Sequence, residues 1–89
     1  MNVFVVKHYK TSKVHIFWFN NEDYQVIFKD HSELQVSKDH INYVNKYGER
    51  KYFHRSSLQH QTDDIKKRMN HTESLFEKIR ESTKYDKNG

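Results

Sequence analysis

The stretch that decides the fold is YQVIFKDHSELQVS, residues 24–37, in which two alternating segments flank a short polar turn. Successive side chains of a β-strand point to opposite faces, so Tyr24–Phe28 and Glu33–Ser37 each predict a strand with one apolar face. The polar residues between them, Lys29 to Ser32, are few enough for a tight connection. The stretch therefore predicts an antiparallel β-hairpin.

Similar alternating segments lie on both sides of this hairpin. They predict four further strands, over about residues 3–9, 14–19, 40–44 and 49–54, each separated from the next by polar residues. The pattern then changes to a helical period, because apolar residues recur at steps of three and four between Ile65 and Ile79. Thr62 is a favourable N-cap, and two aspartates follow it in the first turn. One helix is predicted over about residues 63–84, with a frayed tail at residues 86–89.

Six short strands followed by one helix define an α+β fold. We predict a six-stranded antiparallel meander with the C-terminal helix packed across one face of the sheet. The 89 residues are typical of one domain, which we place at residues 1–85. The helix stripe Ile65, Met69, Phe76 and Ile79 would then belong mainly to the core.

Composition excludes several classes of protein. The chain has no cysteine, which excludes disulfides and cysteine-based zinc sites and is consistent with a cytoplasmic location. The apolar run Ile16 to Phe19 is far shorter than a membrane span, and the first ten residues do not have the pattern of a signal peptide. We therefore expect no membrane association.

The charge pattern is mildly basic. The net charge of +4 comes from 16 basic and 12 acidic side chains that alternate along the chain, so it permits an acidic partner without requiring one. Aromatic and lysine side chains on an antiparallel sheet are also typical of single-stranded nucleic-acid platforms. That function is a lower-ranked alternative, because the sequence has no arginine-rich stretch and no RNA-recognition motif.

The sequence contains no recognised catalytic or metal-binding motif. The seven histidines do not show the spacing of metal ligands, and no serine or threonine lies in a nucleophile motif. The glycine-rich loop and the catalytic signatures of a protein kinase are absent. We therefore expect no catalytic residue, no metal and no cofactor in this chain.

The second predicted strand places aromatic side chains on both faces of the sheet. Phe17 and Phe19 alternate with Ile16 and Trp18, and a single helix can cover only one face. Either a curved sheet buries the two phenylalanines, or they form a protein interface. The second interpretation predicts an apolar groove between sheet and helix that binds an amphipathic or coiled-coil helix. Its candidate contacts are Phe17, Phe19, Leu75 and Phe76.

Three segments in this order resemble a polo box, the non-catalytic C-terminal module of polo-like kinases. They are YQVIFKDHSELQV at residues 24–36, INYVNKYGERKYF at residues 41–53 and DIKKRMNHTESLFEKI at residues 64–79. The resemblance covers about residues 3–79. It implies a six-stranded antiparallel sheet with a closing helix, and a parent chain that is a serine/threonine kinase. Since polo boxes often work in pairs, a homodimer is also expected.

The resemblance also implies that the phosphate site of the polo box family is altered in this chain. In the second box of polo-like kinases, a histidine and a lysine two residues later hold a phosphate; here these positions are His31 and Glu33. A carboxylate repels phosphate, so the two residues predict a degenerate phosphate site. The alternative is a phosphopeptide-binding box in which Lys29 or Lys38 supplies the missing cation. His8 stands where the first box has a tryptophan that packs on the peptide.

A single box without the phosphate pair most resembles the third, C-terminal polo box of the centriolar, Sak-type polo-like kinase (polo-like kinase 4). That resemblance implies binding to a coiled-coil segment of a centriole-assembly scaffold protein. It further implies a location at the centriole or centrosome, and a role in relieving autoinhibition of the kinase during centriole duplication.

Overall fold

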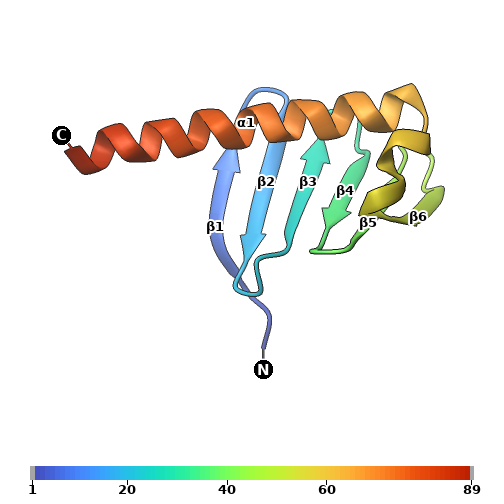
Figure 1. Cartoon of the computed structure of the whole chain (residues 1–89), viewed down its shortest axis with the longest axis horizontal. Coiled ribbons are helices and arrows are strands. Elements are labelled where there is room, and N and C mark those ends of the chain that lie inside the picture. The colour runs from blue at the N-terminus through green and yellow to red at the C-terminus, as the bar shows by residue number, and fades with distance from the viewer. Residues whose placement is uncertain (1, 89) are drawn as a thin grey trace. The chain divides into compact units, whose positions relative to one another are not determined.

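A computed structural model describes the backbone of residues 2–88 and the side chains of residues 2–79. Figure 1 shows the succession of strands and helices along the chain. They are β1 (Val5–Lys10), β2 (Val14–Phe19), β3 (Tyr24–Phe28), β4 (Glu33–Val36), β5 (His40–Val44), β6 (Arg50–His54), a 3-10 helix (Arg55–His60) and α1 (Asp63–Asn88). The chain forms two compact units, Met1–Leu58 with the sheet and Gln59–Gly89 with α1, and each is described by itself.

The six strands form one sheet in the order of the sequence, and each strand is antiparallel to its neighbours. The predicted six-stranded meander with a C-terminal helix is confirmed. The central β3–β4 hairpin is closed by the backbone N–H of Phe28, which donates to the carbonyl of Ser32 at 2.9 Å. This bond sets the register in which Val26 pairs with Leu34.

One face of the sheet carries buried apolar side chains from five strands. Cross-strand pairing places Ile16, Val26, Leu34 and Tyr43 in a single line across β2 to β5. The first three are 0% exposed and Tyr43 is 8% exposed. The other buried members of this face are Val14, Val36, Ile41 and Phe53. Burial of a large apolar side chain stabilises a fold by about 1.5–3 kcal/mol, so this face is the main source of stability in the sheet.

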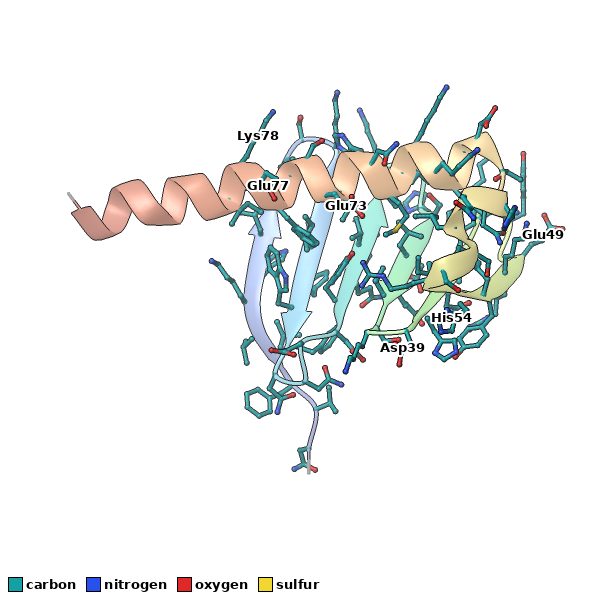
Figure 2. All side chains as sticks on the ribbon, in the orientation of Figure 1. Asp39, Glu49, His54, Glu73, Glu77 and Lys78 are labelled. Carbon is teal, nitrogen blue, oxygen red and sulfur yellow. The ribbon has the colours of Figure 1, made fainter. Side chains whose placement is uncertain are left out.

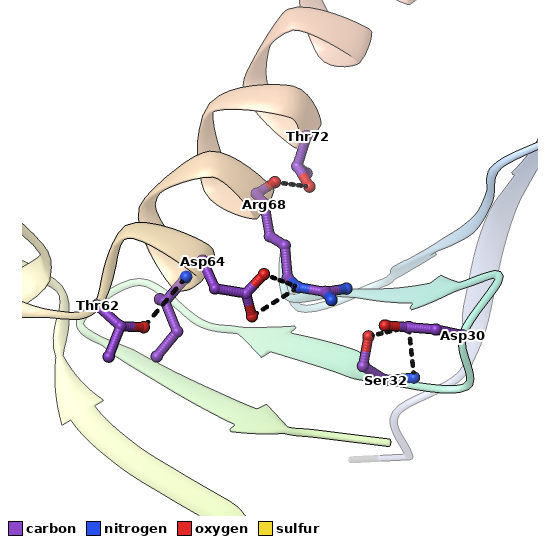
Figure 3. A network of polar contacts seen from close by, with 7 residues as sticks. Asp30, Ser32, Thr62, Asp64, Arg68 and Thr72 are labelled. Carbon is purple, nitrogen blue, oxygen red and sulfur yellow. Dashed lines mark hydrogen bonds and ion pairs between the residues drawn. The ribbon is translucent and has the colours of Figure 1, made fainter.

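Two of the turns contain a residue other than glycine in the left-handed region. Glu22, between β2 and β3, has φ 73°, and His31, between β3 and β4, has φ 71°. The His31 turn is held by Asp30, whose side chain accepts the N–H of Ser32 at 3.0 Å and also the Ser32 hydroxyl (Figure 3). Such an aspartate turn fixes the hairpin and leaves the His31 side chain exposed.

Helix α1 begins where the sequence predicts. The N–H groups of Ile65 and Lys66 donate to the side chain and the carbonyl of Thr62, at 3.4 and 3.1 Å. Asp64 and Arg68 form an ion pair one turn apart, at 3.1 Å (Figure 3). The helix reaches Asn88, past the predicted end at residue 84, so residues 86–88 of the expected tail are helical, and Gly89 lies outside the described residues.

Among the α1 side chains that the structure describes, residues 63–79, the buried ones are Ile65, Met69 and Thr72, at 2%, 0% and 0% exposure. Their spacing of four and three residues places them on one side of the helix. Within residues 2–88, no helix has a window apolar enough to cross a bilayer. The assignment of residues 1–85 to one domain, with the helix packed on the sheet, stays a prediction.

Candidate protein-interaction surface

The face of the sheet opposite the buried one carries a mixture of aromatic, amide and basic side chains; we call it the aromatic–amide face. Phe17 and Phe19 both lie on it, as the alternation of β2 predicts, and both are half-buried. Cross-strand pairing assigns the remaining members to it. They are Val5, His8, Lys10, His15, Gln25, Ile27, Glu33, Gln35, His40, Asn42, Val44, Arg50, Tyr52 and His54.

An aromatic ring stacks on a histidine at each side of this face. On β1 and β2, the His8 ring stacks on Phe17 with 4.5 Å between centroids, and its Nε2 lies 3.3 Å from Nδ1 of His15. On β5 and β6, the ring of His40 stacks on that of Tyr52 at 5.2 Å. His54, labelled in Figure 2, meets His40 edge-on. Stacking restricts the rotamers of Phe17 and Tyr52, which lowers the conformational entropy that these rings would lose on binding a partner.

Amide side chains occupy the strands between the two aromatic clusters. The Asn42 amide donates to Oε1 of Gln35 at 3.1 Å, and the Gln35 amide donates to Glu33 at 2.8 Å. Gln25, the next residue across the sheet, is half-buried, and its side chain has no hydrogen-bond partner among the described residues. The centre of the face therefore has free capacity for hydrogen bonds with a ligand.

A cavity of about 430 Å³ opens on this part of the sheet. Phe19, Tyr24 and Tyr52 supply aromatic walls, and the three amides supply polar groups. The other lining residues are Val3, Asp23, Val36, Ser37 and His40. A hollow that combines aromatic walls with polar groups is typical of a binding site, and this one has room for a few side chains of a partner.

A second cleft, of about 310 Å³, lies beside the turns of the β1–β2 and β3–β4 hairpins. Its charged or titratable lining residues are all basic: Lys10, Lys13, Lys29, His15 and His31. The two turns are joined by the Lys29 N–H, which donates to the carbonyl of Lys13 at 3.1 Å. Three lysines and two histidines around one hollow form a site suited to an anion.

The predicted phosphate pair is divided between these two regions. His31 lines the basic cleft, whereas Glu33 does not and binds Gln35 on the aromatic–amide face. Of the two lysines expected as a substitute cation, Lys29 lines the cleft and Lys38 does not. Lys10 and Lys13 are cleft residues that the sequence prediction missed.

The four predicted groove residues come from both units. Leu75 and Phe76 are half-buried on α1, and Phe17 and Phe19 belong to the sheet unit. A groove formed by all four stays a prediction. Sequence reasoning missed Gln25, Gln35 and Asn42, although they occupy the same alternating positions as Phe17.

No group of three or more histidine, cysteine, aspartate or glutamate side chains is placed to hold a metal within the described part of the chain. The aromatic–amide face and the basic cleft together present aromatic rings, amides and basic side chains, which are groups that can recognise a ligand.

A short antiparallel meander, a C-terminal helix and a recognition surface define a small binding module. The family model of the polo box duplicated region matches residues 11–69 of this chain. The protein therefore belongs to the polo box family, as the sequence resemblance predicts. Polo boxes are non-catalytic modules of polo kinases that bind proteins and phosphopeptides.

A solved structure has the same fold. The crystal structure of the polo-box domain of Cdc5 from budding yeast matches with a TM-score of 0.67 and 18% sequence identity. The match covers 86% of this chain and 37% of the Cdc5 chain, so this protein spans little more than a third of that structure. No curated protein matches the sequence.

Proposed function

We propose that this polo box binds a helical, coiled-coil segment of a centriole-assembly scaffold protein as part of a Sak-type polo-like kinase. In this function the box locates the kinase at the centriole or centrosome and helps to relieve its autoinhibition, while catalysis belongs to another part of the parent chain. The observation that carries the proposal is the aromatic–amide face, which presents stacked rings on the side of the sheet opposite the buried core.

The exposure of the rings supports this proposal. Tyr52 is 68% exposed, and Phe17 and Phe19 are half-buried without belonging to the buried face. Aromatic side chains are enriched among the residues that dominate binding energy at protein interfaces. A helix is a suitable partner because it presents side chains from one stripe to a surface of this size.

The proposal is tested by capture from cell extract, with the whole chain as bait, followed by expression of fragments of each captured protein. We expect the binding fragment to be helical by circular dichroism and to have apolar residues in a heptad repeat. Binding should be lost with the variant Phe17→Asp. Binding fragments that are extended, or that bind Phe17→Asp as well as the unaltered chain, would contradict the proposal.

The basic cleft favours a second candidate function, which is recognition of a phosphopeptide by His31. In this function the lysines of the cleft replace the family's lysine, whose position is occupied by Glu33 in this chain. Glu33 is engaged with Gln35 and does not line this cleft, so a phosphate there meets three lysines and no lining carboxylate. Hydrogen bonds to charged groups contribute about 1.5–3 kcal/mol each, which corresponds to roughly tenfold or more in affinity.

A matched pair of peptides, with and without one phosphoserine, decides between the two functions. If the cleft binds phosphate, the phosphorylated peptide should bind at least about tenfold more tightly, and Lys13→Ala should remove most of the difference. Lys38→Ala is the matched control, because Lys38 is exposed and lies outside the cleft. Equal affinities for the two peptides, measured by calorimetry, would exclude phosphate recognition.

A further inference from the structure

We infer that the aromatic–amide face binds one α-helix that lies across the strands. In this helix, residues i, i+7 and i+14 are apolar, amide-bearing and apolar in turn. This inference rests on the proposed function, because it specifies which helix that function would select. It predicts both the residue pattern of the partner helix and the orientation of that helix across the strands.

The inference begins from a series of cross-strand neighbours that we call the transverse row. It takes one residue from each strand, and each is the direct cross-strand partner of the next. The row is His8, Phe17, Gln25, Gln35, Asn42 and Tyr52. Phe17 and Tyr52 are therefore two aromatic anchors separated by three amides.

The separation of the two anchors corresponds to a whole number of heptads. Neighbouring strands lie about 4.8 Å apart, so the four steps from Phe17 on β2 to Tyr52 on β6 cover about 19 Å. Two heptads of helix, at 1.5 Å per residue, cover about 21 Å. Residues i, i+7 and i+14 of one helix lie on the same side. A helix across the row can thus place its first and third such residues at the anchors.

The middle heptad position then faces the amides. Gln35 lies midway between Phe17 and Tyr52 and is bonded to Asn42, whereas the side chain of Gln25, its cross-strand neighbour, has no partner among the described residues. An apolar side chain above Gln35 would also cover the adjacent Gln25 and remove water from its amide without replacing its hydrogen bonds, which opposes binding. Asparagine or glutamine at the middle position would supply both a donor and an acceptor. The row therefore selects a polar interruption in the apolar stripe of the partner.

A neighbouring line of side chains indicates the charge of the partner. Lys10 and Arg50 lie at its two ends, and its carboxylate, Glu33, accepts a hydrogen bond from Gln35. The rest of this line is His15, Ile27 and Val44. Cations at both ends favour a helix with acidic residues beside its apolar stripe. The occupant is therefore an acidic heptad helix with one central amide.

Three synthetic glutamate-rich helical peptides of equal length test this inference by calorimetry with the whole chain. Their positions i, i+7 and i+14 are Leu–Gln–Leu, Leu–Leu–Gln or Leu–Leu–Leu, so the first two have identical composition. We expect Leu–Gln–Leu to bind about tenfold more tightly than either of the others, because only it satisfies the central amides.

Variants of the chain separate this inference from the proposed function. Gln25→Leu should reverse the preference toward Leu–Leu–Leu, and Gln59→Leu, at an exposed position outside the sheet, is the matched control. Equal affinities of the three peptides, or an unchanged preference in Gln25→Leu, would overturn the inference. The proposed function would still stand if Phe17→Asp abolished capture of a helical fragment. A doubled mass in light scattering that Phe17→Asp reverses would instead assign the face to a second copy of the chain.

Discussion

Replacing Leu34 with alanine is expected to lower the free energy of unfolding by about 2–5 kcal/mol. Leu34 is 0% exposed on the central strand β4, between Val26 and Tyr43. Truncation removes apolar contacts and leaves a cavity that neighbouring strands cannot fill without losing their register. Urea denaturation followed by circular dichroism measures the change.

The same strand supplies the control for this experiment. Gln35 is adjacent to Leu34 but exposed on the opposite face, so Gln35→Ala should change stability by less than about 1 kcal/mol. The free energy of unfolding of a small domain is only about 5–15 kcal/mol, so a large part of the Leu34→Ala protein can be unfolded before urea is added. Ile41→Val, expected to cost about 0.5–1.5 kcal/mol, keeps the measurement in range. A cost below that of Gln35→Ala would contradict the assignment of the buried face.

Replacing Phe17 with aspartate is expected to weaken binding of a helical partner by at least about 30-fold, since aromatic residues that anchor an interface commonly contribute 2 kcal/mol or more. The ring is stacked on His8 and stands in the row that faces the partner. A carboxylate there loses the apolar contact and must be desolvated when the partner docks. The fold should be retained, because Phe17 lies outside the buried face and two histidines lie beside it.

Two further variants show whether this loss is specific. Phe17→Leu retains an apolar side chain and should lose less affinity than Phe17→Asp. Tyr47 is 76% exposed in the β5–β6 turn, away from the aromatic–amide face, so Tyr47→Asp should bind like the unaltered chain. Calorimetry with the mapped partner fragment gives the affinities, and circular dichroism confirms the fold. Unchanged affinity in a folded Phe17→Asp protein would exclude this surface.

The fold could be predicted because its information is local. Each strand has its own alternation of apolar and polar residues, and each turn connects two strands that pair with each other. The hairpin of residues 24–36 therefore shows the same pairing pattern as the rest of the sheet. The end of α1 was less predictable, because no glycine or proline stops the helix before Gly89. Thr62 and the two aspartates after it, by contrast, mark the beginning clearly.

The site could be predicted only where it depends on one strand. Alternation within β2 places Phe17 and Phe19 on the aromatic–amide face, whereas the transverse row depends on five pairings together. On β1, for example, the register of the pairing with β2 shifts between Val5 and Lys7. Such a shift changes which residues of the two strands lie opposite each other. The basic cleft likewise depends on two turns that are distant in sequence and meet through Lys13 and Lys29. A pattern in a single segment contains no such information.

The strand order also has a consequence for how the sheet forms. Because the order β1 to β6 is that of the sequence, every pairing joins segments separated by one short turn. Folding rates rise as the sequence separation between contacting residues falls, since less loop entropy is lost before contacts form. We therefore expect this sheet to assemble faster than most sheets with six strands.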